Sequence, residues 1–137
     1  MFPDVKIILA HLGGTTPFLA SRVAVLSNHM GCPLSPEEIL DDFKSFYYET
    51  ALSSYEPNLL AIEKFVKHDH ILFGSDFPGE GLESVYMAHL NLTVCSAVSK
   101  DMAEWYSAHL QNFYTDKPEK LNGILCNNAL KLFLGPT

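Results

Sequence analysis

Hydrophobic positions along the chain follow two periods in turn, one typical of buried strands and one typical of helices. A nearly continuous apolar run at residues 5–10 predicts a strand buried on both faces. Residues 45–51 are rich in aromatic side chains and predict a second strand, and residues 71–74 predict a third. Apolar residues at helical spacing follow each run, so the pattern predicts an α/β fold with parallel strands and helical crossovers.

Capping residues mark where the first helices should begin. Thr16 is expected to cap the first helix, with Pro17 in its first turn and Gly31 just beyond its end. Ser35 and Glu38 have the spacing of a capping box, which predicts a second, short helix.

The C-terminal half reads as helical. Its pattern runs over residues 82–133, with a break expected at Lys117 and Pro118 and a last short helix at residues 128–133. Asn128 is expected to cap that final helix.

Composition narrows the class of protein. The 137 residues are 47% hydrophobic and 18% charged, which is typical of one globular domain over residues 1–137. A formal net charge of -7 with nine scattered Lys and Arg argues against nucleic acid as a partner. Cys32, Cys95 and Cys126 form no disulfide framework or thiolate zinc motif. With no apparent secretory signal or membrane span, we expect a cytoplasmic protein.

Two residues that could carry chemistry directly follow predicted strands. His11 comes after the first apolar run and Asp76 after the third. Reacting groups of parallel barrels stand at the carboxyl ends of strands, so we expect both at one edge of the sheet, as proton carriers or metal ligands. His68-Asp69-His70 has a ligand-like spacing but precedes a strand, which places it at the opposite edge. A catalytic triad using Ser75 is disfavoured because no nucleophile-elbow motif is present.

Four ordered segments of the chain resemble the closing part of a known family. They are residues 11–18 with Arg22, residues 46–51, residues 74–78 and residues 128–133. In order and spacing they resemble the aminocarboxymuconate-semialdehyde decarboxylase-like branch of the amidohydrolase superfamily, and within it they look most like fungal 6-methylsalicylate decarboxylases. The resemblance implies a partial TIM-like (β/α) barrel: about the last three of eight strands with their helices, plus C-terminal helices.

The resemblance also implies roles for individual residues. His11 matches a catalytic histidine beside a divalent metal, and Asp76 matches an acidic residue that is both catalytic and a metal ligand. Arg22 matches an arginine that binds a substrate carboxylate, in some members across the interface of a homodimer. Zinc is the expected metal, with manganese and magnesium as alternatives. The expected partner is a small-molecule carboxylic acid, with no nucleic acid and no membrane.

The implied reaction is non-oxidative decarboxylation of an aromatic or unsaturated carboxylic acid. The family's early-strand metal ligands, a His-x-His or Glu-x-His pair and a later histidine, should precede His11, and this sequence has no match to them. We therefore expect the isolated chain to lack activity. Two alternatives stay open: a metal-dependent hydrolase of the same superfamily, and a truncated, non-catalytic polypeptide.

Overall fold

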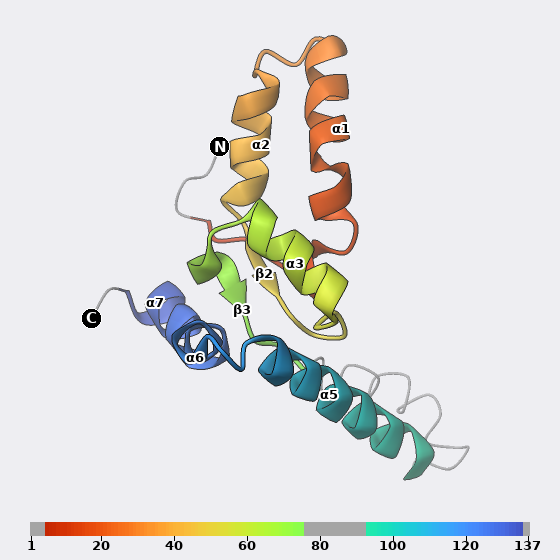
Figure 1. The fold of residues 1–137 in the computed structure, drawn as a ribbon. Coiled ribbons are helices and arrows are strands. Elements are labelled where there is room, and N and C mark those ends of the chain that lie inside the picture. Colours follow the sequence, from red (N-terminus) through yellow and green to blue (C-terminus); the bar gives the residue numbers. More distant parts are fainter. Residues whose placement is uncertain (1–4, 76–92, 136–137) are drawn as a thin grey trace.

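Three short parallel strands form the centre of the fold (Figure 1). The computed structural model describes residues 5–75 and 93–135, with the side chains of residues 93–100 left aside. The strands β1 (Ile8–Leu9), β2 (Tyr47–Glu49) and β3 (Ile71–Leu72) lie in that order, with Ile8 beside Tyr47 and Tyr48 beside Ile71. The three predicted strands and their parallel pairing are confirmed. Their carboxyl ends therefore meet at one edge of the sheet.

The first strand differs from its prediction. Ile7 and Ile8 are 43% and 40% exposed, so the expectation of a strand buried on both faces is wrong for β1. The physical reason is its place at the edge of the sheet, where only β2 pairs with it among the residues described. In contrast, both residues of β3 are buried, as expected.

Two helices form a hairpin that projects from the sheet in Figure 1: α1 (Thr16–His29) and α2 (Pro36–Lys44). The predicted capping box of α2 is confirmed, since the Ser35 hydroxyl accepts from the Glu38 backbone N–H and the Glu38 carboxylate accepts from the Ser35 backbone N–H. The predicted cap of α1 is wrong. Thr16 is already helical, and its hydroxyl donates to the Gly13 carbonyl oxygen at 2.6 Å.

Helical elements make up most of the rest of the described chain, and the last two of them lie against β3 (Figure 1). These elements are α3 (Glu56–Phe65), α5 (Thr93–Phe113), α6 (Pro118–Asn122), a π-helical turn η3 (Gly123–Asn127) and α7 (Asn128–Leu134). The break at Lys117 and Pro118 is confirmed. The helical prediction for residues 82–92 lies outside the described residues.

Asn128 is not a helix cap. The helix continues from η3 into α7, so no free N–H groups are left there for a cap to satisfy. Asn128 is instead 4% exposed, and its side-chain amide donates to the His68 and Ile71 carbonyl oxygens at 2.9 and 2.8 Å. It therefore ties α7 to the amino end of β3.

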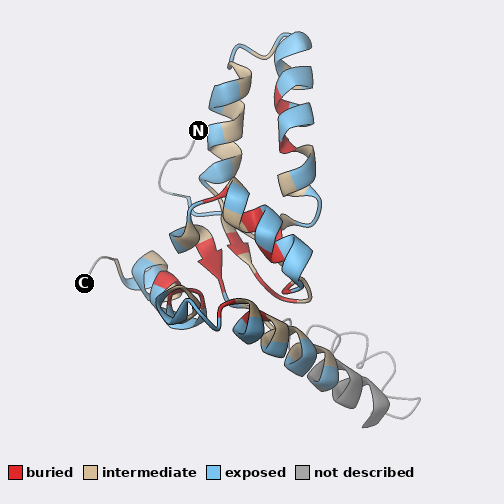
Figure 2. Ribbon diagram, in the orientation of Figure 1, coloured by how far each residue is buried: buried red, intermediate tan, exposed pale blue. Residues whose placement is uncertain are grey.

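The hydrophobic core lies between the sheet, α3 and the C-terminal helices (Figure 2). Its buried members are Leu12, Tyr48, Leu59, Ile62, Val66, Ile71, Leu110, Tyr114 and Ile124. The outer side of α1, by comparison, exposes large apolar side chains, including Phe18 at 79% and Met30 at 84%. The core therefore fixes the sheet and α3 more firmly than the projecting hairpin.

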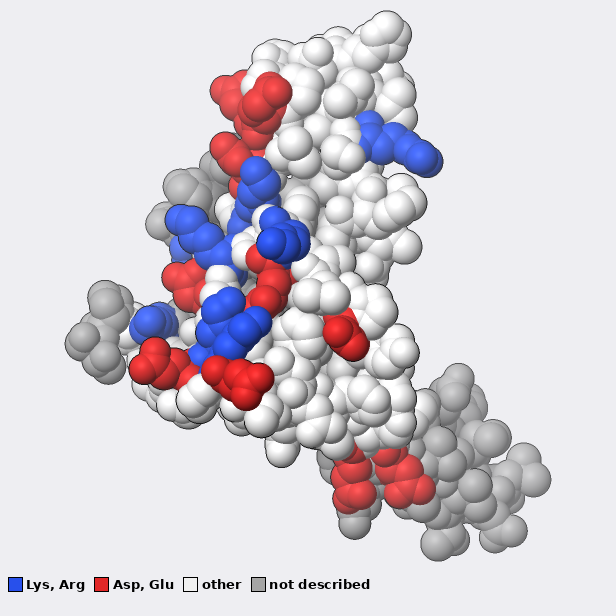
Figure 3. Space-filling model, viewed as in Figure 1, with Lys and Arg blue, Asp and Glu red and all other residues white. Residues whose placement is uncertain are grey.

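Charged side chains of both signs interleave on the face shown in Figure 3. One such group joins Glu63 of α3 to Lys120 at 2.8 Å and to Lys117 at 3.8 Å. Burial favours a higher pKa for Glu63, but the hydrogen bond and positive charge of Lys120, with the charge of Lys117, outweigh it and lower the pKa. Among the described helices, none is both long and apolar enough to cross a membrane.

Candidate active site

His11 lies in a left-handed turn at the carboxyl end of β1. Four successive residues have positive φ: His11 at 55°, Leu12 at 52°, Gly13 at 72° and Gly14 at 57°. For non-glycine residues this conformation costs of order 1–3 kcal/mol each. The turn is held by hydrogen bonds from Gly13 N–H to the Ala10 carbonyl at 2.8 Å and from Gly14 N–H to the His11 carbonyl at 2.9 Å.

Packing from β2 explains the glycine at position 13. A Cβ there would lie 2.7 Å from the Tyr48 ring, closer than side-chain atoms approach. Tyr48 is fully buried, and its hydroxyl donates to the Phe43 carbonyl oxygen at 2.6 Å. The ring cannot retreat, so Gly13 is required both by its φ and by the space available.

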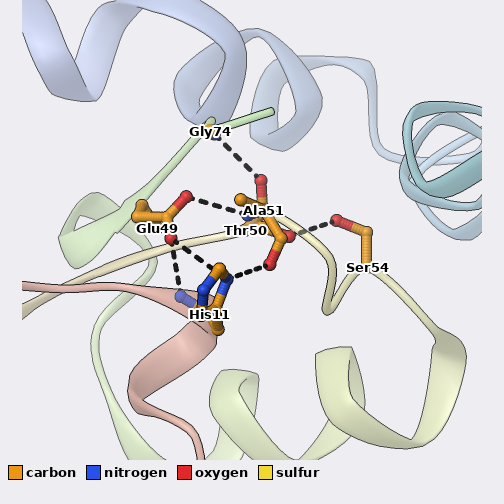
Figure 4. Close-up of polar contacts among 6 residues, drawn as sticks. All are labelled: His11, Glu49, Thr50, Ala51, Ser54 and Gly74. Carbon is orange, nitrogen blue, oxygen red and sulfur yellow. Dashed lines mark hydrogen bonds and ion pairs between the residues drawn. The ribbon is translucent and has the colours of Figure 1, made fainter. Parts of the chain in front are cut away.

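The Glu49 carboxylate, at the end of β2, connects the loops that follow β1 and β2 (Figure 4). One oxygen accepts the backbone N–H of His11 at 2.6 Å, and the other accepts the backbone N–H of Ala51 at 2.9 Å. The same carboxylate lies 3.8 Å from Nδ1 of His11. Because its side chain is only 19% exposed, these bonds are largely shielded from water.

The His11 ring is oriented by a second contact with the same loop. Nδ1 lies 3.0 Å from the Ala51 carbonyl oxygen. A carbonyl oxygen only accepts, so Nδ1 carries the proton in this bond and Nε2 is the nitrogen left for chemistry. The His11 side chain is 43% exposed, so it is accessible from outside the core.

A further layer of hydrogen bonds fixes the loop after β2. Thr50 is fully buried; its hydroxyl accepts the Gly74 N–H at 3.2 Å, and its carbonyl accepts the Ser54 hydroxyl at 3.1 Å. A Cβ at Gly74 would collide with the Glu49 carboxylate. Gly74, which follows β3, is therefore packed directly against the Glu49 carboxylate, which binds the backbone of His11.

The predicted metal ligand Asp76 lies outside the described residues, so its placement beside His11 stays a prediction. Within the parts of the chain that the structure describes, no three His, Cys, Asp or Glu side chains gather closely enough to hold a metal ion. Both Glu49 oxygens already accept backbone N–H groups. The described donors alone therefore fall short of the three protein ligands usual in a catalytic zinc site.

Comparison of the amino-acid sequence with known proteins identifies a family. The amidohydrolase family model matches residues 1–134. The chain belongs to the amidohydrolase family. The small parallel sheet with its helices is consistent with that family, as a partial α/β fold.

Fungal decarboxylases are among the relatives of this chain. Decarboxylase yanB of Aspergillus niger is 46% identical over 80 residues, which are 56% of this chain and 22% of the relative. The 6-methylsalicylic acid decarboxylase of Penicillium expansum is 44% identical over 79 residues, 56% of this chain and 24% of the relative. Decarboxylase macB of Penicillium terrestre is 47% identical over 87 residues, which are 61% of this chain and 26% of the relative. The chain spans about a quarter of the length of these curated relatives.

The other candidates predicted from the sequence stand on different elements from His11. Arg22 is exposed on α1. His68 and His70 form the turn η2 (His68–His70) before β3, and Nδ1 of His70 lies 2.9 Å from the carbonyl oxygen of Phe46, which precedes β2. Both histidines are therefore at the amino edge of the sheet, as predicted, and not beside His11.

Sequence reasoning did not identify Glu49 as part of the site. It falls within residues 46–51, one of the four family-like segments, and it is an acidic residue that closes an otherwise aromatic strand. That position was the available signal, because a carboxylate at the carboxyl end of a buried strand needs hydrogen-bond partners. Its partners are 38 and 2 residues away along the chain, and only the fold brings the distant one near.

Proposed function

We propose that this chain provides the proton-carrying histidine of a metal-dependent, non-oxidative decarboxylase of aromatic carboxylic acids such as 6-methylsalicylate. The observation that carries the proposal is the geometry of His11. Its Nδ1 is engaged by the Ala51 carbonyl at the carboxyl edge of a parallel sheet, which leaves Nε2 for the substrate. The named activity of the fungal relatives supports the choice of reaction.

Decarboxylation requires a proton at the carbon that loses carbon dioxide. As the bond between the ring and the carboxylate breaks, its electron pair stays on the ring carbon, which then takes up a proton. Nε2 of His11 can acquire that proton from solvent and deliver it, and the Ala51 carbonyl continues to accept from Nδ1 throughout. The product of 6-methylsalicylate would be 3-methylphenol.

A divalent metal, with zinc preferred over manganese or magnesium, belongs to the proposal. Asp76 would hold it together with ligands from outside this chain. When bound, it would stabilise negative charge on the substrate's oxygens and ring. The described residues offer too few donors to hold the metal by themselves. The remaining ligands would come from the rest of a (β/α) barrel, of which this chain would supply the last three strands.

We expect the purified 137-residue chain to bind zinc and manganese weakly and to release no carbon dioxide from 6-methylsalicylate. The chain mixed with the N-terminal portion of the Penicillium expansum relative, called here the complemented enzyme, should gain one metal and decarboxylase turnover. Titration calorimetry and carbon dioxide release are the measurements. The Asp76→Ala variant serves as the control, because it should lower both metal binding and turnover.

Other outcomes of these measurements would contradict the proposal in different ways. Tight one-to-one metal binding and turnover by the chain alone would show that its site is already complete. Hydrolysis of amides or lactones by the complemented enzyme, without decarboxylation, would assign it to the hydrolases of the family. A folded, metal-bound complemented enzyme with neither activity would mark the chain as non-catalytic.

The proposal includes a homodimer in which Arg22 binds the substrate carboxylate of the partner subunit. Arg22 is exposed on α1, the helix that also exposes Phe18, Val25, Leu26 and Met30 at 51–84%. An apolar surface of this kind is typical of a protein interface. Burying α1 between two subunits would cover it and place a guanidinium, which pairs with carboxylates through two parallel hydrogen bonds, near a substrate.

Arg22→Ala is expected to raise the KM of the complemented enzyme for 6-methylsalicylate about tenfold, the effect of losing a charge-assisted hydrogen bond. Arg22→Lys should recover part of the loss, because the ammonium keeps the charge but not the planar fork. Steady-state kinetics and sedimentation equilibrium provide the readouts. A monomeric enzyme with unchanged KM in Arg22→Ala would refute both the dimer and the role of Arg22.

A further inference from the structure

We propose that Glu49 is a positioning residue that fixes the ring nitrogen His11 presents for catalysis; this rests on the proposed function of His11. Glu49 does not reach the substrate in this proposal. It acts by accepting hydrogen bonds from the backbone of two loops. Gly74 has no side chain and so leaves room for the Glu49 carboxylate in this position. Its effect should therefore be visible in the protonation pattern of the His11 ring.

The hydrogen bonds among His11, Glu49 and Ala51 form a closed ring. The His11 N–H donates to one Glu49 oxygen, and the Ala51 N–H donates to the other. The Ala51 carbonyl in turn accepts from Nδ1 of His11 (Figure 4). One carboxylate thus fixes the position of the His11 backbone and also the position of the residue whose carbonyl orients the His11 ring. Moving the carboxylate would loosen both ends together.

Glu49 also holds a backbone in an unfavourable conformation. His11 and Leu12 both have positive φ, which is unfavourable for residues with a side chain. Leu12 is held by burial, at 3% exposed, whereas the His11 side chain is half-exposed and lacks such an anchor. The 2.6 Å hydrogen bond to the Glu49 carboxylate is the charge-assisted contact at His11's own backbone.

The Glu49 carboxylate occupies the space that a side chain at position 74 would need. A Cβ on Gly74 would collide with the Glu49 carboxylate, although the φ of Gly74 is not in the left-handed region. Alanine is therefore allowed at this position by the backbone and is opposed only by the carboxylate. Gly74→Ala consequently offers a way to displace Glu49 without changing its chemistry.

Nitrogen NMR of the 137-residue chain, labelled at histidine, tests the tautomer directly. In its neutral form, the His11 ring should carry the proton on Nδ1. In Glu49→Gln one oxygen becomes an NH2 donor that faces a backbone N–H, so the ring should shift toward the Nε2-protonated form that free histidine prefers. Gly74→Ala should produce the same shift.

The matched control is Glu63→Gln, which changes another glutamate of similar exposure, 14% against 19%, that binds lysines instead of the His11 loop. It should destabilise the chain and leave the His11 signals unchanged. Glu49→Ala combined with Gly74→Ala should resemble Glu49→Ala alone, because the added methyl group then has no carboxylate to displace. Unchanged His11 signals in Glu49→Gln, or strictly additive effects in the double variant, would overturn the proposal.

Activity separates this inference from the proposed function. In the complemented enzyme, Glu49→Gln and Gly74→Ala should each lower kcat roughly a hundredfold, as misplacement of a catalytic group does, with little change in KM. A tautomer shift with no enzyme activity in any variant, wild type included, would refute the decarboxylase proposal and leave the role of Glu49 intact. Normal kcat in both variants would refute Glu49 as a positioning residue even if decarboxylation is real.

Discussion

Replacing His11 by glutamine is expected to lower kcat of the complemented enzyme for 6-methylsalicylate roughly 10²–10⁴-fold, the usual contribution of a positioned acid or base. Glutamine is polar and can still hydrogen bond to the Ala51 carbonyl, which accepts Nδ1 in the native chain at 3.0 Å. It cannot acquire and release a proton near neutral pH. The loss should therefore appear in kcat and leave KM nearly unchanged.

The control for this variant is His109→Gln, which removes an imidazole from α5, outside the proposed site and the α1 interface, and should leave kcat unaltered. Carbon dioxide release under saturating substrate is the measurement, with metal content determined for each variant so that a lost metal is not mistaken for a lost proton carrier. A decrease of less than tenfold in a metal-loaded His11→Gln enzyme would rule out His11 as the proton carrier.

Much of the fold was predictable because it follows from local patterns. The capping box of Ser35 and Glu38 spans four residues, and both of its hydrogen bonds form as the spacing requires. The three strands were found from their apolar and aromatic runs, and the direction of the chain through them placed His11 at the carboxyl edge and His70 at the amino edge. None of these steps needs a contact between distant segments.

The errors and omissions concern contacts between distant segments. Asn128 was expected to cap a helix, which is its common local use, but its amide bonds residues 57 and 60 positions away. Glu49 was overlooked because its value depends on His11, 38 positions away. In each case a polar side chain satisfies backbone groups of another segment, and no periodicity in the sequence records such a pairing.

The exposure of β1 has a different origin. Its apolar run was correctly interpreted as a strand, but Ile8 is 40% exposed because β2 is its only partner in the described chain. An apolar strand of a parallel sheet is normally covered on both faces. The sequence thus encodes burial that the described residues do not provide, which is consistent with a chain spanning about a quarter of its curated relatives.

Tyr48→Ala is expected to lower the free energy of unfolding by about 3–5 kcal/mol, the range for removing a large buried aromatic side chain. The Tyr48 ring is fully buried, lies under Gly13 of the His11 turn and packs edge-on against Phe65 at 6.1 Å between centroids. Tyr48→Phe keeps the ring and loses only the 2.6 Å hydrogen bond to the Phe43 carbonyl, so about 0.5–1.5 kcal/mol should be lost. Urea unfolding followed by circular dichroism measures both.

The two variants should also differ in their response to alkaline pH. Burial raises the pKa of Tyr48 from 10.0 to about 12, so between these values the unfolded chain releases a proton that the folded chain retains. The stability contributed by Tyr48 is therefore complete below pH 10 and is lost as the pH rises toward 12. Tyr48→Phe has no proton to release at this position, so its stability should fall less steeply over this range. Tyr106→Phe, at a half-buried tyrosine, serves as the control. Identical alkaline slopes for the native chain and Tyr48→Phe would contradict the raised pKa of Tyr48. A loss below 1 kcal/mol in Tyr48→Ala would mean that the buried ring does not support the His11 turn.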